Sequence, residues 1–243
     1  MKLKLSWIFA SIAPAAGLLF QPVAKPTPND GRTPAMWGDS QITIRVHDYA
    51  EVKSGVLLQA ERSAGNILRK SGIESNWVVC RVGETPSADA ACTRSMTPLD
   101  FVLNLLPRSM AQRSNFQDEV FGVAVESAEK GFGFYASIFY DHVKDCAAHE
   151  HLDLAPLLGH VIAHELGHLL LGTRSHTVHG LMPASWTNKH LQAAERRALT
   201  FSAPEAQRLQ IAMMTRRQSA LRVAENRESL ASVPPSGQSQ VQP

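Results

Sequence analysis

The chain has 243 residues, of which 44% are hydrophobic, and a formal net charge of +2. This length and composition suit one well-packed core rather than two separate domains. No run of lysine and arginine with interleaved aromatic residues occurs, so nucleic-acid binding is not expected. We expect a monomer.

The first 24 residues have the composition of an export signal. Lys2 and Lys4 give a basic start, an apolar run follows, and small residues such as Ala24 offer cleavage points. Because the run is too short to span a bilayer comfortably, we expect no stable membrane insertion once the signal is removed. Residues 1–24 are therefore predicted to be a signal peptide of a secreted or periplasmic protein. The proline-rich residues 25–40 are predicted to be a flexible arm.

Between residues 41 and 140 the pattern predicts five strands and one helix. Gln41–Tyr49 alternates apolar and polar residues, which is typical of a strand. Glu51–Lys70 has apolar residues at helical spacing and is closed by a Ser-Gly pair. Four more runs rich in β-branched or aromatic residues are predicted to be strands: Ile73–Cys80, Leu99–Leu106, Val120–Val125 and Gly131–Tyr140.

Three cysteines occur in the chain. An oxidising compartment favours disulfides, and Cys80 and Cys92 lie at the two ends of a short polar loop. We therefore predict a disulfide between these two residues. Cys146 is then predicted to be a free thiol, buried or half-buried.

The residues that predict chemistry are His164, Glu165 and His168, inside an apolar run that Asp153 is predicted to cap. On a helix, histidines four residues apart share one face, about 5–6 Å apart at Cβ, so both can bind one Zn²⁺. A carboxylate next to the first histidine can deprotonate a metal-bound water. Gly172 is predicted to end the helix. This pattern favours a catalytic zinc site.

The motif and the residues that follow it resemble the metzincin clan of zinc endopeptidases, whose pattern is HExxHxxGxxH followed by a methionine turn. Here the glycine, Gly172, falls eight residues after the first histidine instead of seven, and His176 falls twelve after it instead of ten. Arg174 stands at the usual ligand place, and Gly180-Leu181-Met182 follows. The chain is similar, more specifically, to a group of secreted bacterial proteins that share this longer loop.

The resemblance implies a zinc-dependent endopeptidase acting on a peptide or protein substrate. His164, His168 and His176 would bind Zn²⁺, Glu165 would be the general base, and Met182 would lie beneath the metal. In the family, an extended substrate adds to the edge strand of the sheet. The resemblance assigns that role to a short, nearly uncharged segment here: Phe121, Gly122, Val123 and Ala124.

The third ligand is assigned to His176 because of its reach. Four residues can span at most about 13–14 Å, which is enough for the chain to double back from Gly172 to the metal. Arg174 is a permanent cation and cannot bind zinc. His179 lies only three residues before Met182, and Glu195 lies where another clan of zinc peptidases places a glutamate ligand. Those two residues remain the alternatives.

The end of the chain is predicted to be helical and then disordered. Asn188–Leu199 is predicted to be a helix, and a capping box that ends at Glu205 opens a last helix, which reaches about Ala220. We expect a catalytic domain over residues 41–222 and a disordered tail over residues 223–243.

The element order predicts an α+β fold, with α/β as the alternative. A twisted, mixed five-stranded sheet would pack on the first helix and the active-site helix, with C-terminal helices after them. The predicted function is peptide-bond hydrolysis. The alternative is a zinc-stabilised, non-catalytic module that binds peptides, which the lengthened ligand loop favours. Glu165 argues against that alternative, because a purely structural zinc site does not need it.

Overall fold

A computed structural model describes residues 3–4, 41–80, 90–113, 116, 120–126, 133–172 and 175–231. The expected signal peptide, apart from Leu3–Lys4, and the expected arm lie outside the described residues. So do Arg174 and residues 232–243. Export and the arm therefore stay predictions, and so does the tail from residue 232 onward, whereas residues 223–231 of the expected disordered tail are helical.

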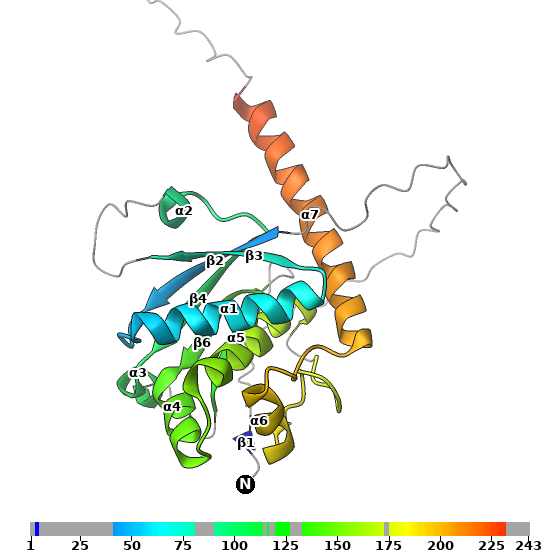
Figure 1. The fold of residues 1–243 in the computed structure, drawn as a ribbon. Helices are drawn as coiled ribbons and strands as arrows, with labels where there is room; N and C mark the ends of the chain where they lie inside the picture. The colour runs from blue at the N-terminus through cyan, green and yellow to red at the C-terminus, as the bar shows by residue number, and fades with distance from the viewer. Residues whose placement is uncertain are drawn as a thin grey trace, which may run out of the picture.

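The centre of the fold is one mixed sheet in the order β3-β2-β4-β6-β5 (Figure 1). Strands β3, β2, β4 and β6 run parallel to one another, and β5 is antiparallel to β6. The five predicted strands are confirmed, with ends that differ by a few residues: β2 (Gln41–Asp48), β3 (Glu74–Val79), β4 (Asp100–Leu106), β5 (Gly122–Glu126) and β6 (Gly133–Phe139).

The fold is α/β rather than the expected α+β. Parallel neighbours need crossover connections, and the long helix α1 (Ser54–Lys70) supplies the one between β2 and β3. The sequence pattern does not reveal strand direction, so the two classes could not be separated before the pairing was known.

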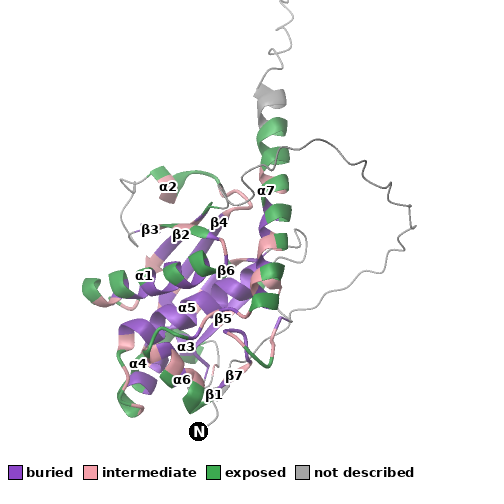
Figure 2. Cartoon of the chain, turned by 45° about the vertical axis from the view of Figure 1, so that its right-hand side comes forward, coloured by how far each residue is buried: buried purple, intermediate pink, exposed green. Residues whose placement is uncertain are grey.

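Two long helices, α1 and α5 (Leu154–Leu171), pack against each other beside the sheet. Where they cross, a Cβ on Gly159 would lie 2.5 Å from the Cβ of Ser63, so only glycine permits this approach. Helix α5 is buried along almost its whole length (Figure 2). It is long and apolar enough to cross a membrane by length and composition, but 89% of it is buried inside the protein. It is the core helix.

The other helices differ in part from expectation. Helix α6 (Asn188–Glu195) ends before the predicted Leu199, and α7 (Ala203–Ala231) continues past Ala220. Helix α4 (Tyr140–His149) was not predicted, although Val143, Cys146 and Ala147 give it a buried face at helical spacing. The remaining short helices are α2 (Ala90–Thr93) and α3 (Arg108–Arg113).

The predicted disulfide between Cys80 and Cys92 is confirmed, with Cα atoms 5.7 Å apart. Cys146 is free and buried, and burial raises the pKa of its thiol to about 11. A short strand β1 (Leu3–Lys4), inside the expected signal peptide, pairs antiparallel with β7 (Ser185–Trp186).

Candidate metal centre

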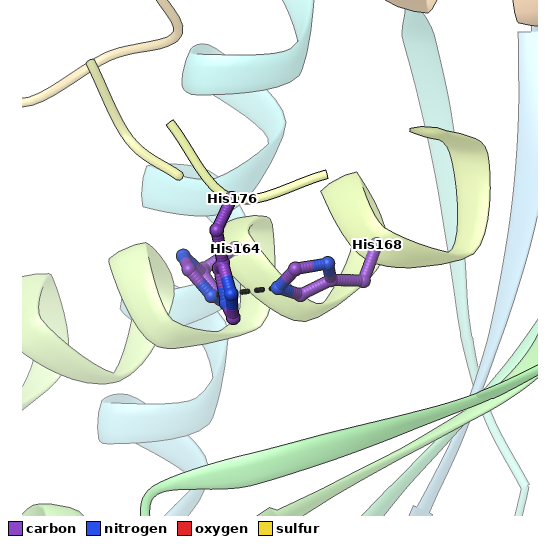
Figure 3. Close-up of side chains that lie close together, drawn as sticks. All are labelled: His164, His168 and His176. Carbon is purple, nitrogen blue, oxygen red and sulfur yellow. Dashed lines mark hydrogen bonds between the residues drawn. The ribbon is translucent and has the colours of Figure 1, made fainter. Parts of the chain in front are cut away.

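Helix α5 presents His164 and His168 on one face. The helix begins as predicted, because the side chain of Asp153 accepts a hydrogen bond from the Ala155 N–H at 3.2 Å. Both imidazoles are buried, and their Nε2 atoms are 3.0 Å apart (Figure 3). Two nitrogens bound to one tetrahedral zinc at 2.0–2.1 Å would be about 3.3 Å apart. The two rings are therefore close to the spacing that a shared zinc ion requires.

His176 joins the two helical histidines. Helix α5 ends at Leu171 as predicted, and Gly172 follows with φ of +89°, in the region that favours glycine. The chain then returns, and ligand-capable nitrogens of His164, His168 and His176 all lie within 4.8 Å of one another. Figure 3 shows the His176 ring directed at the other two.

The two alternative ligands lie elsewhere within the described part of the chain. His179 is exposed and does not belong to the histidine group. Glu195 accepts a hydrogen bond from the Asp153 N–H at 2.8 Å, and thus serves the start of helix α5. Neither residue is therefore placed to bind a metal ion together with His164 and His168.

Hydrogen bonds to the other ring nitrogens orient the imidazoles. His164 Nδ1 lies 2.9 Å from the Leu181 carbonyl oxygen, and His168 Nδ1 lies 2.9 Å from Ser175 Oγ. With the proton on Nδ1, each ring donates to its oxygen and keeps an Nε2 lone pair for a metal. Ser175 and Leu181 were not predicted as site residues, since no motif marks a buried serine or a main-chain carbonyl.

Burial keeps the three imidazoles neutral. It lowers the pKa of His164 to about 3, and it also lowers the pKa values of His168 and His176. Neutral imidazole is the form that binds zinc. The donor set, the spacing and the protonation state thus fit a zinc ion.

Glu165 is buried beside strand β5. Its Oε2 has no hydrogen-bond partner, and burial raises its pKa to about 8. A nearby cation would favour the charged form and lower that pKa. A Cβ on Gly122 would lie 2.8 Å from Cγ of Glu165, so the strand approaches the carboxyl closely only because residue 122 is glycine.

Met182 is buried against helix α5 at Gly167, a residue that lies between His164 and His168 in sequence. A Cβ on Gly167 would lie 2.7 Å from Met182 Sδ, so this glycine makes room for the sulfur. The turn before it contains Gly180 with φ of +83°. The expectation that Met182 floors a metal site stays a prediction.

The sequence pattern predicts Glu205 as a helix-capping residue but does not indicate that it contacts the site. Its predicted capping role holds, since the Ser202 N–H donates to Oε2 at 2.6 Å. The same carboxylate also accepts from the Leu181 and Met182 N–H groups, each at 3.3 Å, and from Thr177 Oγ1. A capping-box pattern could have located Glu205, but not these long-range contacts.

Strand β5 lies at the edge of the sheet, as expected for the segment Phe121–Ala124. The Phe139 N–H donates to the Phe121 carbonyl at 2.8 Å, and bonded pairs alternate along antiparallel strands. Phe121 and Val123 therefore direct their main-chain groups at β6. Gly122 and Ala124 direct theirs away from it, so only these two of the four can offer main-chain groups to an added strand.

No known family model matches the chain, and no curated protein matches its sequence. Among solved structures, the chain is similar to archaemetzincin from Methanopyrus kandleri. The two share 16% sequence identity, and the superposition covers 72% of this chain and 97% of the other, with a TM-score of 0.45.

Proposed function

We propose that the chain is a secreted zinc-dependent endopeptidase of the metzincin type. The observation that carries the proposal is that three neutral imidazoles converge beside a buried carboxyl, in the order of an HExxH motif. His164, His168 and His176 would hold the ion and leave a fourth position free.

A zinc ion held there would polarise the scissile carbonyl and acidify water. Glu165 would take the proton of the attacking water and pass it to the leaving amine. Burial raises the pKa of Glu165, and a cation bound beside it would favour the charged form that accepts a proton. The Leu181 carbonyl and Ser175 would keep the imidazoles oriented throughout.

The direct test pairs zinc content with cleavage of a broad peptide library. Wild type should bind zinc stoichiometrically and cleave peptides. Glu165→Ala and the isosteric Glu165→Gln should keep zinc and lose about 10²–10⁴-fold in turnover, the usual contribution of a general base.

The rival function is a zinc-stabilised module that binds peptides without cleaving them. Bound zinc with no cleavage by the wild type would favour that module. Absence of zinc binding by the wild type would contradict both functions.

We also propose that an extended substrate pairs with β5. The groups available to it are the Gly122 and Ala124 main-chain groups, which face away from β6. Ala124→Pro should therefore impair turnover with zinc still bound, since proline removes an outward donor. Val123→Pro removes a donor to β6 instead, and should destabilise the sheet. Full turnover by a folded Ala124→Pro variant would contradict substrate pairing here.

A further inference from the structure

We infer that Glu205, at the start of the last helix, is a positioning residue for the metal centre. The inference rests on the proposed zinc site and adds a residue that lies far from the HExxH motif in sequence. Glu205 is fully buried, and it belongs to α7 rather than to the helix or the loop that carries the histidines.

The Glu205 carboxylate accepts hydrogen bonds from three main-chain N–H groups and from one hydroxyl, that of Thr177, which also lies 2.8 Å from the His179 carbonyl oxygen and shares its single proton between the two acceptors. Oε1 accepts from Thr177 Oγ1 and from the Met182 N–H, and Oε2 accepts from the N–H groups of Leu181 and Ser202. The donors come from the third-ligand loop, the methionine turn and the start of α7. One buried charge therefore joins three segments.

The first connection runs to His164. The N–H of Leu181 is bound by Glu205, and the carbonyl of the same residue accepts the His164 Nδ1 proton at 2.9 Å. Fixing Leu181 at its nitrogen limits the movement of its carbonyl. Glu205 thereby helps to set the tautomer and the ring orientation of the first ligand.

The second connection runs to His176. Thr177, the next residue, donates its hydroxyl to Glu205 and its N–H to the Met182 carbonyl at 3.0 Å. The loop from residue 177 to residue 182 is thus closed on itself and held against α7. Since His176 itself is only half-buried, this anchorage adds to its ring contacts with His164 and His168 in placing the ring.

Substituting glutamine separates this role from ordinary helix capping. A capping box accepts Glu or Gln, because one acceptor oxygen is enough. At Glu205 both oxygens face main-chain donors, the Met182 N–H at Oε1 and the Leu181 and Ser202 N–H groups at Oε2, so the NH₂ group of a glutamine would meet at least one main-chain donor in either orientation. Residue 205 must therefore be a carboxylate if it positions the loop.

The experiment measures zinc affinity by chelator competition in wild type, Glu205→Gln and Glu195→Gln. Glu205→Gln should weaken zinc binding about 10–100-fold, the range found for partners of metal ligands. Glu195→Gln is the matched control, because Glu195 Oε2 accepts the Asp153 N–H and an amide oxygen can do the same. It should bind zinc like wild type. Visible spectra of the Co²⁺-substituted proteins should show altered coordination in Glu205→Gln alone.

Zinc affinity and cobalt spectrum unchanged in Glu205→Gln would overturn the inference while leaving the proposed zinc site intact. No zinc binding by wild type would instead refute the site itself. If Glu205→Gln does not fold, Thr177→Val serves in its place, because it removes one donor from Oε1. Thr177→Val should weaken zinc binding several-fold, and an unchanged affinity would likewise count against the inference.

Discussion

The helix and the loop that bring the histidines together are held by different means. On α5, His164 and His168 are one turn apart on a helix that is buried almost throughout, so local periodicity and core packing fix both. His176 lies on a half-exposed loop whose geometry depends on a carboxylate 29 positions further along the chain. Helical periodicity thus positions two of the proposed ligands, and hydrogen bonds between distant parts of the chain support the loop that carries the third.

The largest expected effect comes from removing the loop ligand. His176→Ala should lose zinc affinity by more than the roughly 10–100-fold cost of losing a partner of a ligand, and activity should fall with it. Chelator competition and peptide cleavage measure the two losses.

His179→Ala is the control, since His179 is exposed on the same loop and outside the histidine group. It should retain both zinc and activity. Full zinc occupancy in His176→Ala would reopen His179 and Glu195 as ligands.

The same contrast explains how far the sequence could be interpreted. Periodicity located the five strands, the first helix and the whole of α5, because those elements obey local rules. The position of His176 beside His164 and His168 agrees with the estimated length that the four residues after Gly172 can span. Strand direction and the contacts of Glu205 depend on distant segments, and no local pattern encodes them.

Helix α4 was missed for a different reason. Its charged and histidine residues suggest a solvated loop, and they obscure a short buried face around Val143.

A smaller effect should follow from Gly180→Ala, which disturbs the turn in the loop from residue 177 to residue 182. Residue 180 has φ of +83°, and a Cβ there would lie 2.1 Å from Glu205 Oε2 and 2.7 Å from the Ser202 nitrogen. The loop must shift to admit the methyl group, so zinc affinity should fall about tenfold, near the lower limit for a disturbed ligand partner.

Gly55→Ala provides the matched control for that experiment. Gly55 lies in α1, and a Cβ there has no atom within 4 Å. This variant should leave zinc affinity unchanged. If Gly180→Ala binds zinc as tightly as wild type does, the loop can shift with little loss of free energy. The loop would then be held less firmly than its hydrogen bonds indicate.

The smallest effect concerns the scaffold behind α5, where Glu61 of α1 is buried and its Oε1 has no hydrogen-bond partner. Burial raises its pKa to about 7, so the folded state retains a proton that the unfolded state, with a pKa of 4.5, releases. The contribution of Glu61 to stability should be highest below about pH 4.5, fall as the pH rises to about 7, and then level off.

Glu61→Gln removes this ionisation. It should stabilise the fold by on the order of 1–2 kcal/mol at pH 8, after allowance for partial solvation, and by little at pH 4.5. Thermal unfolding of both proteins at the two pH values gives the comparison. Zinc affinity should not change, because α1 contributes no ligand. A gain in stability that is the same at both pH values would contradict the assigned ionisation.

The position of Glu205 near the end of the fold has a consequence for the order in which the protein matures. A chain made from its N-terminus presents the HExxH helix about 40 residues before the carboxylate that anchors the loop of His176. Until α7 docks, the hydrogen bonds from Glu205 to this loop are missing, and an incomplete chain would lack that support for the proposed metal centre. The proposed peptidase activity would then emerge only once nearly all of the domain has been made.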